Sequence, residues 1–145
     1  MSVLEKIQSI TFGTELEYTG ITRRAAAIAI FNVLGGNVRH VGGAYDTWTV
    51  FAPDGREWNV VSDASLGDRG NSAEVVTPIL RYADMATLQD VVRALRKAGA
   101  QTPACTSQHV HIGVADWAPR QIANLARIYY KQEALILRAV GKIGR

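Results

Sequence analysis

Cysteine, long apolar runs and linker-like segments are scarce in this sequence. Its 145 residues include one cysteine, Cys105, so no disulfide forms within the chain and nothing indicates an oxidising compartment. The longest apolar stretch, residues 25–31, is far shorter than the ~18 residues that a membrane-spanning helix needs. Residues 1–10 lack the apolar segment and the cleavage site of a secretory signal. We therefore expect a cytoplasmic protein with no membrane-spanning segment.

The composition predicts one globular domain over residues 1–145. Hydrophobic residues make up 48% of the chain and charged residues 20%, which is ordinary for a globular protein. The net charge is +3, and the basic residues are scattered. Because proteins that bind nucleic acids usually concentrate basic charge on one stripe or helix, we do not expect nucleic acid as a partner.

The hydrophobic periodicity predicts an α+β fold. Alternating or β-rich segments indicate strands over residues 9–18, 37–41, 47–52, 57–63, 73–77 and 108–114. Helical spacing and end signals indicate helices over residues 23–34, 84–99 and 119–140. Asp54-Gly55 between two β-rich runs is typical of a hairpin turn. The order of these elements predicts a largely antiparallel sheet backed by helices.

Two glutamates stand at alternate positions of the first predicted strand. Side chains two apart on a strand share a face and lie about 7 Å apart, so Glu15 and Glu17 project together. Such a carboxylate pair suits a hard divalent cation, Mg²⁺ or Mn²⁺. A solvent-exposed strand face is the commoner explanation when this segment is considered alone.

His109 and His111 share a strand face by the same alternation. Imidazoles ligate transition metals and also hydrogen-bond phosphates or carboxylates. The alternative is one core histidine bonded to backbone and one surface histidine. Cys105 lies in the same short stretch, whereas the partners of a catalytic Cys–His pair come from separate elements.

A third polar group flanks a glycine-rich loop at residues 67–72. Asp63 ends one predicted strand and Glu74 lies in the next, so both can face one cleft. The loop can present backbone N–H groups and Arg69 to an anion, although it does not match the P-loop pattern. A polar connection between two strands is the alternative.

Four segments in this order resemble the amidoligase family, small relatives of glutamine synthetase and γ-glutamylcysteine synthetase. The family pattern has an aromatic-Gly-x-Glu-x-Glu strand, an Asp-x-Ser after a Trp-containing hairpin, a Glu before Ser/Thr-Pro, and a His-x-His-x-Gly strand. The matching segments here are Phe12-Gly13-Thr14-Glu15-Leu16-Glu17, Asp63-Ala64-Ser65, Glu74-Val75-Val76-Thr77-Pro78 and His109-Val110-His111-Ile112-Gly113. The resemblance covers roughly residues 10–140.

This resemblance implies a curved, mainly antiparallel sheet with helices on its outer face. It implies an ATP- and Mg²⁺-dependent ligase that joins a small-molecule or peptide carboxylate to an amine through an acyl-phosphate. The metal, Mg²⁺ or Mn²⁺, would be held by four residues: Glu15, Glu17, Glu74 and His109. Among the remaining site residues, His111 would contact the phosphate or the activated carboxyl group, Asp63 would act at the metals or the incoming amine, and Ser65 and Arg69 would bind the ATP.

Members of this family usually continue beyond the last helix into further strands. We therefore expect this chain to be a catalytic half, a short form, or a chain completed by a homodimer or another partner. An open sheet edge or the apolar helix at residues 25–31 would form the contact. Two other functions remain open: a non-catalytic binding or structural module on the same scaffold, and a single-metal enzyme with His109, His111 and Glu74 around iron or manganese.

Overall fold

The computed structural model describes residues 2–67 and 70–140, which divide into two compact units. The first unit comprises residues 1–113 and the second residues 114–145. The second unit contains α4 (Pro119–Ala139), which begins at Pro119 as predicted and buries none of its side chains. None of the helices in the described ranges is both long and apolar enough to cross a membrane. A single domain over residues 1–145 stays a prediction.

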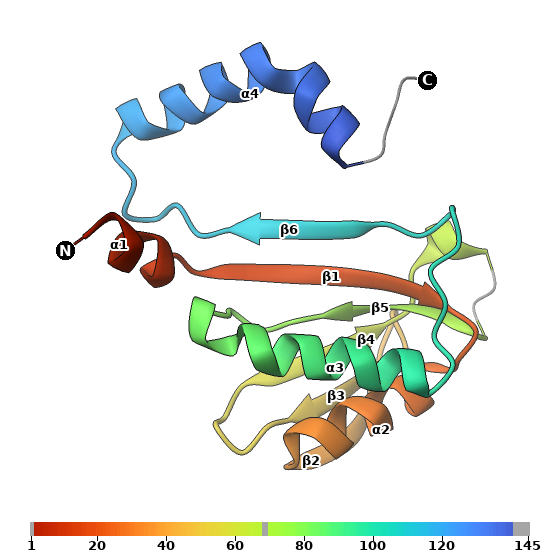
Figure 1. Ribbon diagram of the computed structural model, residues 1–145. Coiled ribbons are helices and arrows are strands. Elements are labelled where there is room, and N and C mark those ends of the chain that lie inside the picture. Colours follow the sequence, from red (N-terminus) through yellow and green to blue (C-terminus); the bar gives the residue numbers. More distant parts are fainter. Residues whose placement is uncertain (1, 68–69, 141–145) are drawn as a thin grey trace. The chain divides into compact units, whose positions relative to one another are not determined.

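A six-stranded sheet forms the first unit and confirms the predicted α+β class (Figure 1). Its strand order is β2-β3-β4-β5-β1-β6, and every neighbouring pair is antiparallel. The bounds are β1 Phe12–Thr19, β2 Asn37–Gly42, β3 Thr47–Phe51, β4 Glu57–Val61, β5 Ser72–Val76 and β6 Gln108–Ile112. Strand β1 therefore lies between two strands that come much later in the sequence.

Two helices, α2 (Arg23–Leu34) and α3 (Met85–Lys97), pack on one face of this sheet (Figure 1). The hydroxyl of Thr22 caps α2 by accepting a hydrogen bond from the Ala25 N–H at 3.2 Å. Helix α2 contacts both α3 and strands β2 to β4, so Ala26 and Ile30 are fully buried, as its nearly all-apolar sequence predicts. Trp58 lies in this core.

The other sheet face is polar and is covered by neither α2 nor α3. Because side chains alternate along a strand, burial of Leu16, Tyr18 and Val75 toward the helices sends their neighbours to the opposite side. We call this side the open face; it carries five polar residues that matter below: Glu15, Glu17, Thr49, Asn59 and Glu74.

The structure contains a helix that the sequence did not predict, α1. Helix α1 (Val3–Ser9) buries no side chain and begins with a capping box in which Ser2 and Glu5 bond each other's backbone N–H.

After α2 the chain turns at Gly36, where φ is +88° and an added Cβ would lie 2.0 Å from the Phe51 carbonyl oxygen. Only glycine fits this approach of backbone to backbone.

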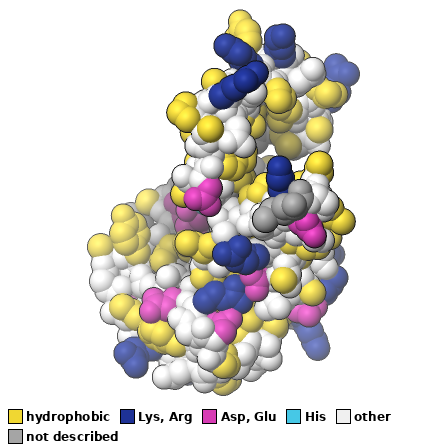
Figure 2. All heavy atoms as spheres, turned by 90° about the vertical axis from the view of Figure 1, so that its left-hand side faces the viewer, with side chains coloured by type: hydrophobic (Ala, Val, Ile, Leu, Met, Phe, Trp, Pro, Cys, Tyr) yellow, Lys and Arg dark blue, Asp and Glu magenta, His cyan; other side chains and the backbone are white. Residues whose placement is uncertain are grey.

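Acidic and basic side chains are interspersed on the face of the first unit that Figure 2 shows. In the lower part of Figure 2, Lys and Arg side chains lie beside Asp and Glu and form no continuous basic stripe. Arg56, for example, contacts the carboxylates of Asp54 at 2.8 Å and Asp84 at 2.9 Å. The expectation that nucleic acid is not a partner stays a prediction.

Candidate metal-binding and active site

Three predicted site residues converge on the open face. Glu17, Asp63 and Glu74 each place a carboxylate oxygen within 4.8 Å of the other two. Glu17 in β1 and Glu74 in β5 are direct cross-strand partners, and Glu74 is also paired with Val61 of β4. Asp63 follows Val61 by two residues, and its Oδ1 accepts a hydrogen bond from the Ser65 N–H at 2.8 Å. We call these three residues the carboxylate cluster.

The cluster is electrostatically unfavourable without a cation. Burial raises the pKa of Glu74, and the negative charges of Glu15, Asp63 and Glu17 raise it further. No ion pair found within residues 2–67 and 70–140 includes a member of the cluster. Like charges directly opposite each other destabilise a sheet, whereas a hard divalent cation prefers carboxylate oxygens. The donor set therefore fits Mg²⁺ or Mn²⁺.

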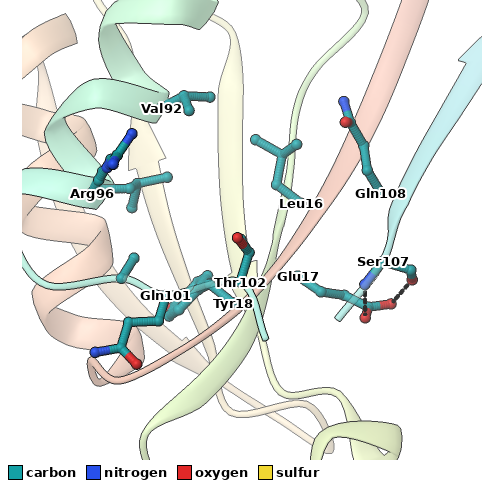
Figure 3. Close-up of a pocket in the computed structure, with 11 residues that line it drawn as sticks. Leu16, Glu17, Tyr18, Val92, Arg96, Gln101, Thr102, Ser107 and Gln108 are labelled. Carbon is teal, nitrogen blue, oxygen red and sulfur yellow. Dashed lines mark hydrogen bonds between the residues drawn. The ribbon is translucent and has the colours of Figure 1, made fainter. Parts of the chain in front are cut away.

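Ser107, just before β6, fixes the Glu17 carboxylate. Its backbone N–H and its hydroxyl donate hydrogen bonds to the two carboxylate oxygens at 2.7 and 2.6 Å (Figure 3). Each carboxylate oxygen keeps a second lone pair, so Glu17 remains able to ligate a cation. Ser107 was not predicted as a site residue, although extending the strand by one residue would place it on the same face as His109.

The two histidines gather around Glu15 instead of joining the cluster. Nδ1 of His109 lies 2.7 Å from Oε2 of Glu15, and Nε2 of His111 lies 3.1 Å from Oε1. Glu15 and His109 are cross-strand partners, whereas His111 is opposite Gly13, whose missing side chain leaves room for the imidazole to reach Glu15. The hydrogen bond between Glu15 and His109 lowers the pKa of the carboxyl and raises the pKa of the imidazole.

Ser107 also links the two groups, because its Oγ lies 3.3 Å from Nε2 of His109. The four predicted metal ligands thus form adjoining parts of one site: Glu17 and Glu74 lie in the carboxylate cluster with Asp63, and Glu15 and His109 lie beside it. These four ligands lie on three neighbouring strands, β5, β1 and β6.

Comparison with known proteins identifies the family of the chain. A family model described as "putative amidoligase enzyme" matches residues 8–142. The chain belongs to this amidoligase family. No curated protein and no solved structure matches it.

The structure also explains the glycine of the His-x-His-x-Gly segment in this amidoligase. Gly113 of the His-x-His-x-Gly segment donates its N–H to the Thr11 carbonyl at 2.8 Å, and an added Cβ would lie 2.1 Å from Oγ1 of Thr11. The absence of a side chain therefore lets the end of β6 lie against the start of β1.

The predicted nucleotide contacts of the amidoligase are less defined. Ser65 is exposed in the short 3-10 helix Ala64–Leu66, and its N–H bonds Asp63. Arg69 lies outside the described residues. Ser65 therefore helps to position a cluster carboxylate, and its proposed contact with ATP stays a prediction.

A groove of about 630 Å³ lies between β1, α3 and residues 100–108 (Figure 3). Its lining is mainly apolar and includes Leu16, Tyr18 and Val92, which face the helix side of the sheet. Neither Asp63 nor Glu74 contributes to it. Glu17 and Ser107 also line the groove, so it adjoins the carboxylate cluster at Glu17, while the other two cluster carboxylates lie outside it.

Proposed function

We propose that this amidoligase is an ATP- and Mg²⁺-dependent ligase that joins a carboxylate to an amine. The observation that carries the proposal is the carboxylate cluster: three acidic groups within 4.8 Å of one another, beside a histidine-bearing strand. Phosphoryl transfer needs charge neutralisation and positioning more than a covalent group from the protein, and the site has that composition.

The reaction would proceed in two displacements. An oxygen of the substrate carboxylate attacks the γ-phosphorus of ATP, the bond to the β-γ bridging oxygen breaks, and ADP leaves. The amine nitrogen then attacks the acyl carbon of the acyl-phosphate. The carbon–oxygen bond to phosphate breaks, the nitrogen loses a proton, and an amide and inorganic phosphate remain.

The acidic residues and the two histidines each have a part in this scheme. Glu17, Glu74 and Asp63 would hold Mg²⁺ or Mn²⁺, which supplies positive charge against the ATP phosphates. Glu15 would keep His109 oriented through their 2.7 Å contact, with His109 adding a ligand from the edge strand. His111 is 63% exposed and would contact the transferred phosphate or the activated carboxyl group.

Binding of a non-hydrolysable ATP analogue tests the proposal, because the acid and amine need not be known. We expect calorimetry to show affinity that requires Mg²⁺, and electron paramagnetic resonance to show bound Mn²⁺. Glu74→Gln and His109→Ala should weaken both signals, whereas Glu57→Gln, an exposed carboxylate of β4, should change neither.

Two outcomes would contradict the ligase. Folded protein that binds neither Mn²⁺ nor the nucleotide would favour a non-catalytic module. Iron retained through purification would favour the single-metal enzyme, because Mg²⁺ sites exchange their ion readily whereas a histidine-rich iron site does not.

A further inference from the structure

One row of paired residues crosses all six strands of the open face. The strand registers align, from β2 to β6, Arg39, Thr49, Asn59, Val76, Glu15 and His109. The last two belong to the site described above. The first three form a second polar region on the same face, at the opposite edge of the sheet.

This second region is a hollow of about 520 Å³, lined in part by Arg39, Asn59 and Val76. The Arg39 guanidinium carbon lies 5.2 Å from the centroid of the Phe51 ring, so the side chain extends over β3. Stacking on an aromatic ring orients the guanidinium and leaves its N–H groups free at the edge. None of the ion pairs in the described part of the chain involves Arg39.

Asn59 supplies a second donor to the hollow. Its Oδ1 accepts a hydrogen bond from the Thr49 hydroxyl at 2.7 Å, which fixes the amide and leaves Nδ2 as the outward donor. Nδ2 has no hydrogen-bond partner among the residues that the structure describes. Glu57, the cross-strand partner of Phe51, also lines the hollow, but no ion pair joins it to Arg39 among the described residues.

We infer that this hollow binds a second carboxylate of the acid substrate, while the reacting carboxylate lies at the carboxylate cluster. The inference rests on the proposed function and names its substrate class: an elongated acid with anionic groups at both ends. A guanidinium fork binds a planar carboxylate through two hydrogen bonds, and Asn59 adds a third donor. Val76, between the two regions, provides an apolar floor for the connecting chain.

The geometry sets the length of this substrate. Arg39 in β2 and Glu74 in β5 are three strand spacings apart, about 14 Å, and Glu74 lies two residues away from the Arg39 row, so the two backbones are about 16 Å apart. The two carboxylates of the substrate would lie roughly 13–16 Å apart, the length of about four to five extended peptide residues. A short peptide with a free C-terminal carboxylate fits, whereas a small amino acid does not span the two regions.

Matched peptides test the inference on the full chain saturated with Mn²⁺ and the ATP analogue. The probes are N-acetyl-Glu followed by one or three glycines, each with a free C-terminus or as the C-terminal amide. We expect calorimetry to show that the longer acid binds roughly tenfold more tightly than its amide, the effect of a charge-assisted hydrogen bond. The acid and the amide of the one-glycine peptide should bind with similar affinity.

Arg39→Gln should abolish the preference for the longer acid and leave Mn²⁺ binding unchanged, and Arg39→Lys should restore part of the preference. Arg24→Gln, an exposed arginine of α2, is the control that should behave as wild type. Equal binding of acid and amide at both lengths, with Mn²⁺ bound normally, overturns this inference alone. Weaker binding of the ATP analogue in Arg39→Gln also overturns it, because the hollow would then hold the nucleotide. Absence of any metal-dependent nucleotide binding overturns the proposed function and this inference together.

Discussion

Replacing Glu74 by glutamine should make the metal-free protein more stable and remove its response to divalent ions. The substitution keeps the shape of the side chain and removes one negative charge from the carboxylate cluster. Glu74 makes no hydrogen bond or ion pair with a described residue that the change would sacrifice. The cluster therefore costs folding free energy, which a bound cation would offset.

The magnitude follows from the 4.8 Å limit on the oxygen–oxygen distances. Two unit charges at that distance repel by about 1 kcal/mol in water and by about 3.5 kcal/mol at an effective dielectric constant of 20. Glu74 has two such neighbours, Glu17 and Asp63. Partial solvent exposure and proton uptake by Glu74 both reduce the sum, so we expect Glu74→Gln to stabilise the protein by roughly 1–3 kcal/mol near neutral pH.

The gain should depend on pH in a defined direction. Folding raises the pKa of Glu74 above its ordinary value of 4.5, so the folded state binds its proton more readily than the unfolded state. Below pH 4.5 both states are protonated and the wild type suffers no penalty. As pH rises through the raised pKa the carboxylate ionises in the folded protein, and the advantage of the glutamine variant grows until ionisation is complete.

Urea denaturation between pH 4 and pH 8, with and without Mn²⁺, measures both effects. A free-ion concentration a hundredfold above Kd should add about 2.7 kcal/mol to the wild type and little to Glu74→Gln. Glu57→Gln, on the same face but outside the cluster, should keep the wild-type response. A glutamine variant that is less stable than wild type without metal, or that gains as much from Mn²⁺, would refute the electrostatic reasoning.

Three further predictions concern the backbone, the core and the histidines. Gly36→Ala should destabilise the protein by more than about 3 kcal/mol in urea denaturation, because backbone strain at positive φ is added to a clash with a carbonyl oxygen. Tyr18→Phe should stabilise it by about 1 kcal/mol in the same assay, because burial leaves the tyrosine hydroxyl without a partner among the described residues. His109 should titrate above its ordinary pKa of 6.5 in an NMR titration of the imidazole carbons, and Glu15→Gln should lower that pKa.

Matched controls make these predictions specific. Gly55 also has a positive φ, but an added Cβ there meets no atom within 4 Å, so Gly55→Ala should cost only about 1–2 kcal/mol. Tyr45 is 65% exposed, and Tyr45→Phe should change stability by less than about 0.5 kcal/mol. Equal changes in stability for the two glycine variants, or for the two tyrosine variants, would contradict the structural explanation. A His109 pKa that is unaffected by loss of the Glu15 charge would contradict it as well.

The His109–Glu15 pair should stabilise the fold within one window of pH. The contribution of the protonated imidazole to the free energy of unfolding is fully present below pH 6.5 and is lost as pH rises through its raised pKa. The contribution of the Glu15 carboxylate is present above pH 4.5 and is lost as pH falls through its lowered pKa. His109 is exposed and Glu15 is only partly buried, so the effect is small and is best observed through the NMR titration.

Local patterns were sufficient to predict most elements of the fold. Alternation in β1 placed Glu15 and Glu17 on one face, and Thr22 together with Gly35 marked the ends of α2. Helix α1 was missed because it buries no side chain, yet Ser2-Val3-Leu4-Glu5 carries the capping-box pattern that would have identified it. Such signals depend only on residues close together in the sequence.

The cross-strand partners of the site residues could not be predicted from local patterns. Whether Glu17 faces Glu74, and whether His109 faces Glu15, depends on how β5 and β6 pair with β1, more than 50 and 90 residues away in the chain. A shift of one residue in either pairing would reverse which side chains share a face. The sequence could therefore name the chemical groups but could not divide them into a carboxylate cluster and a histidine group.

The register that brings the carboxylates together is fixed from the other side of the sheet. Ala73 and Val75 are fully buried against the helices, and a one-residue shift of β5 would expose both and bury Glu74. Burial of two apolar side chains is worth several kcal/mol, more than the repulsion of roughly 1–3 kcal/mol expected between the carboxylates. The hydrophobic core can thus hold Glu17 and Glu74 opposite each other without a cation, which is how a binding site can exist before its ligand arrives.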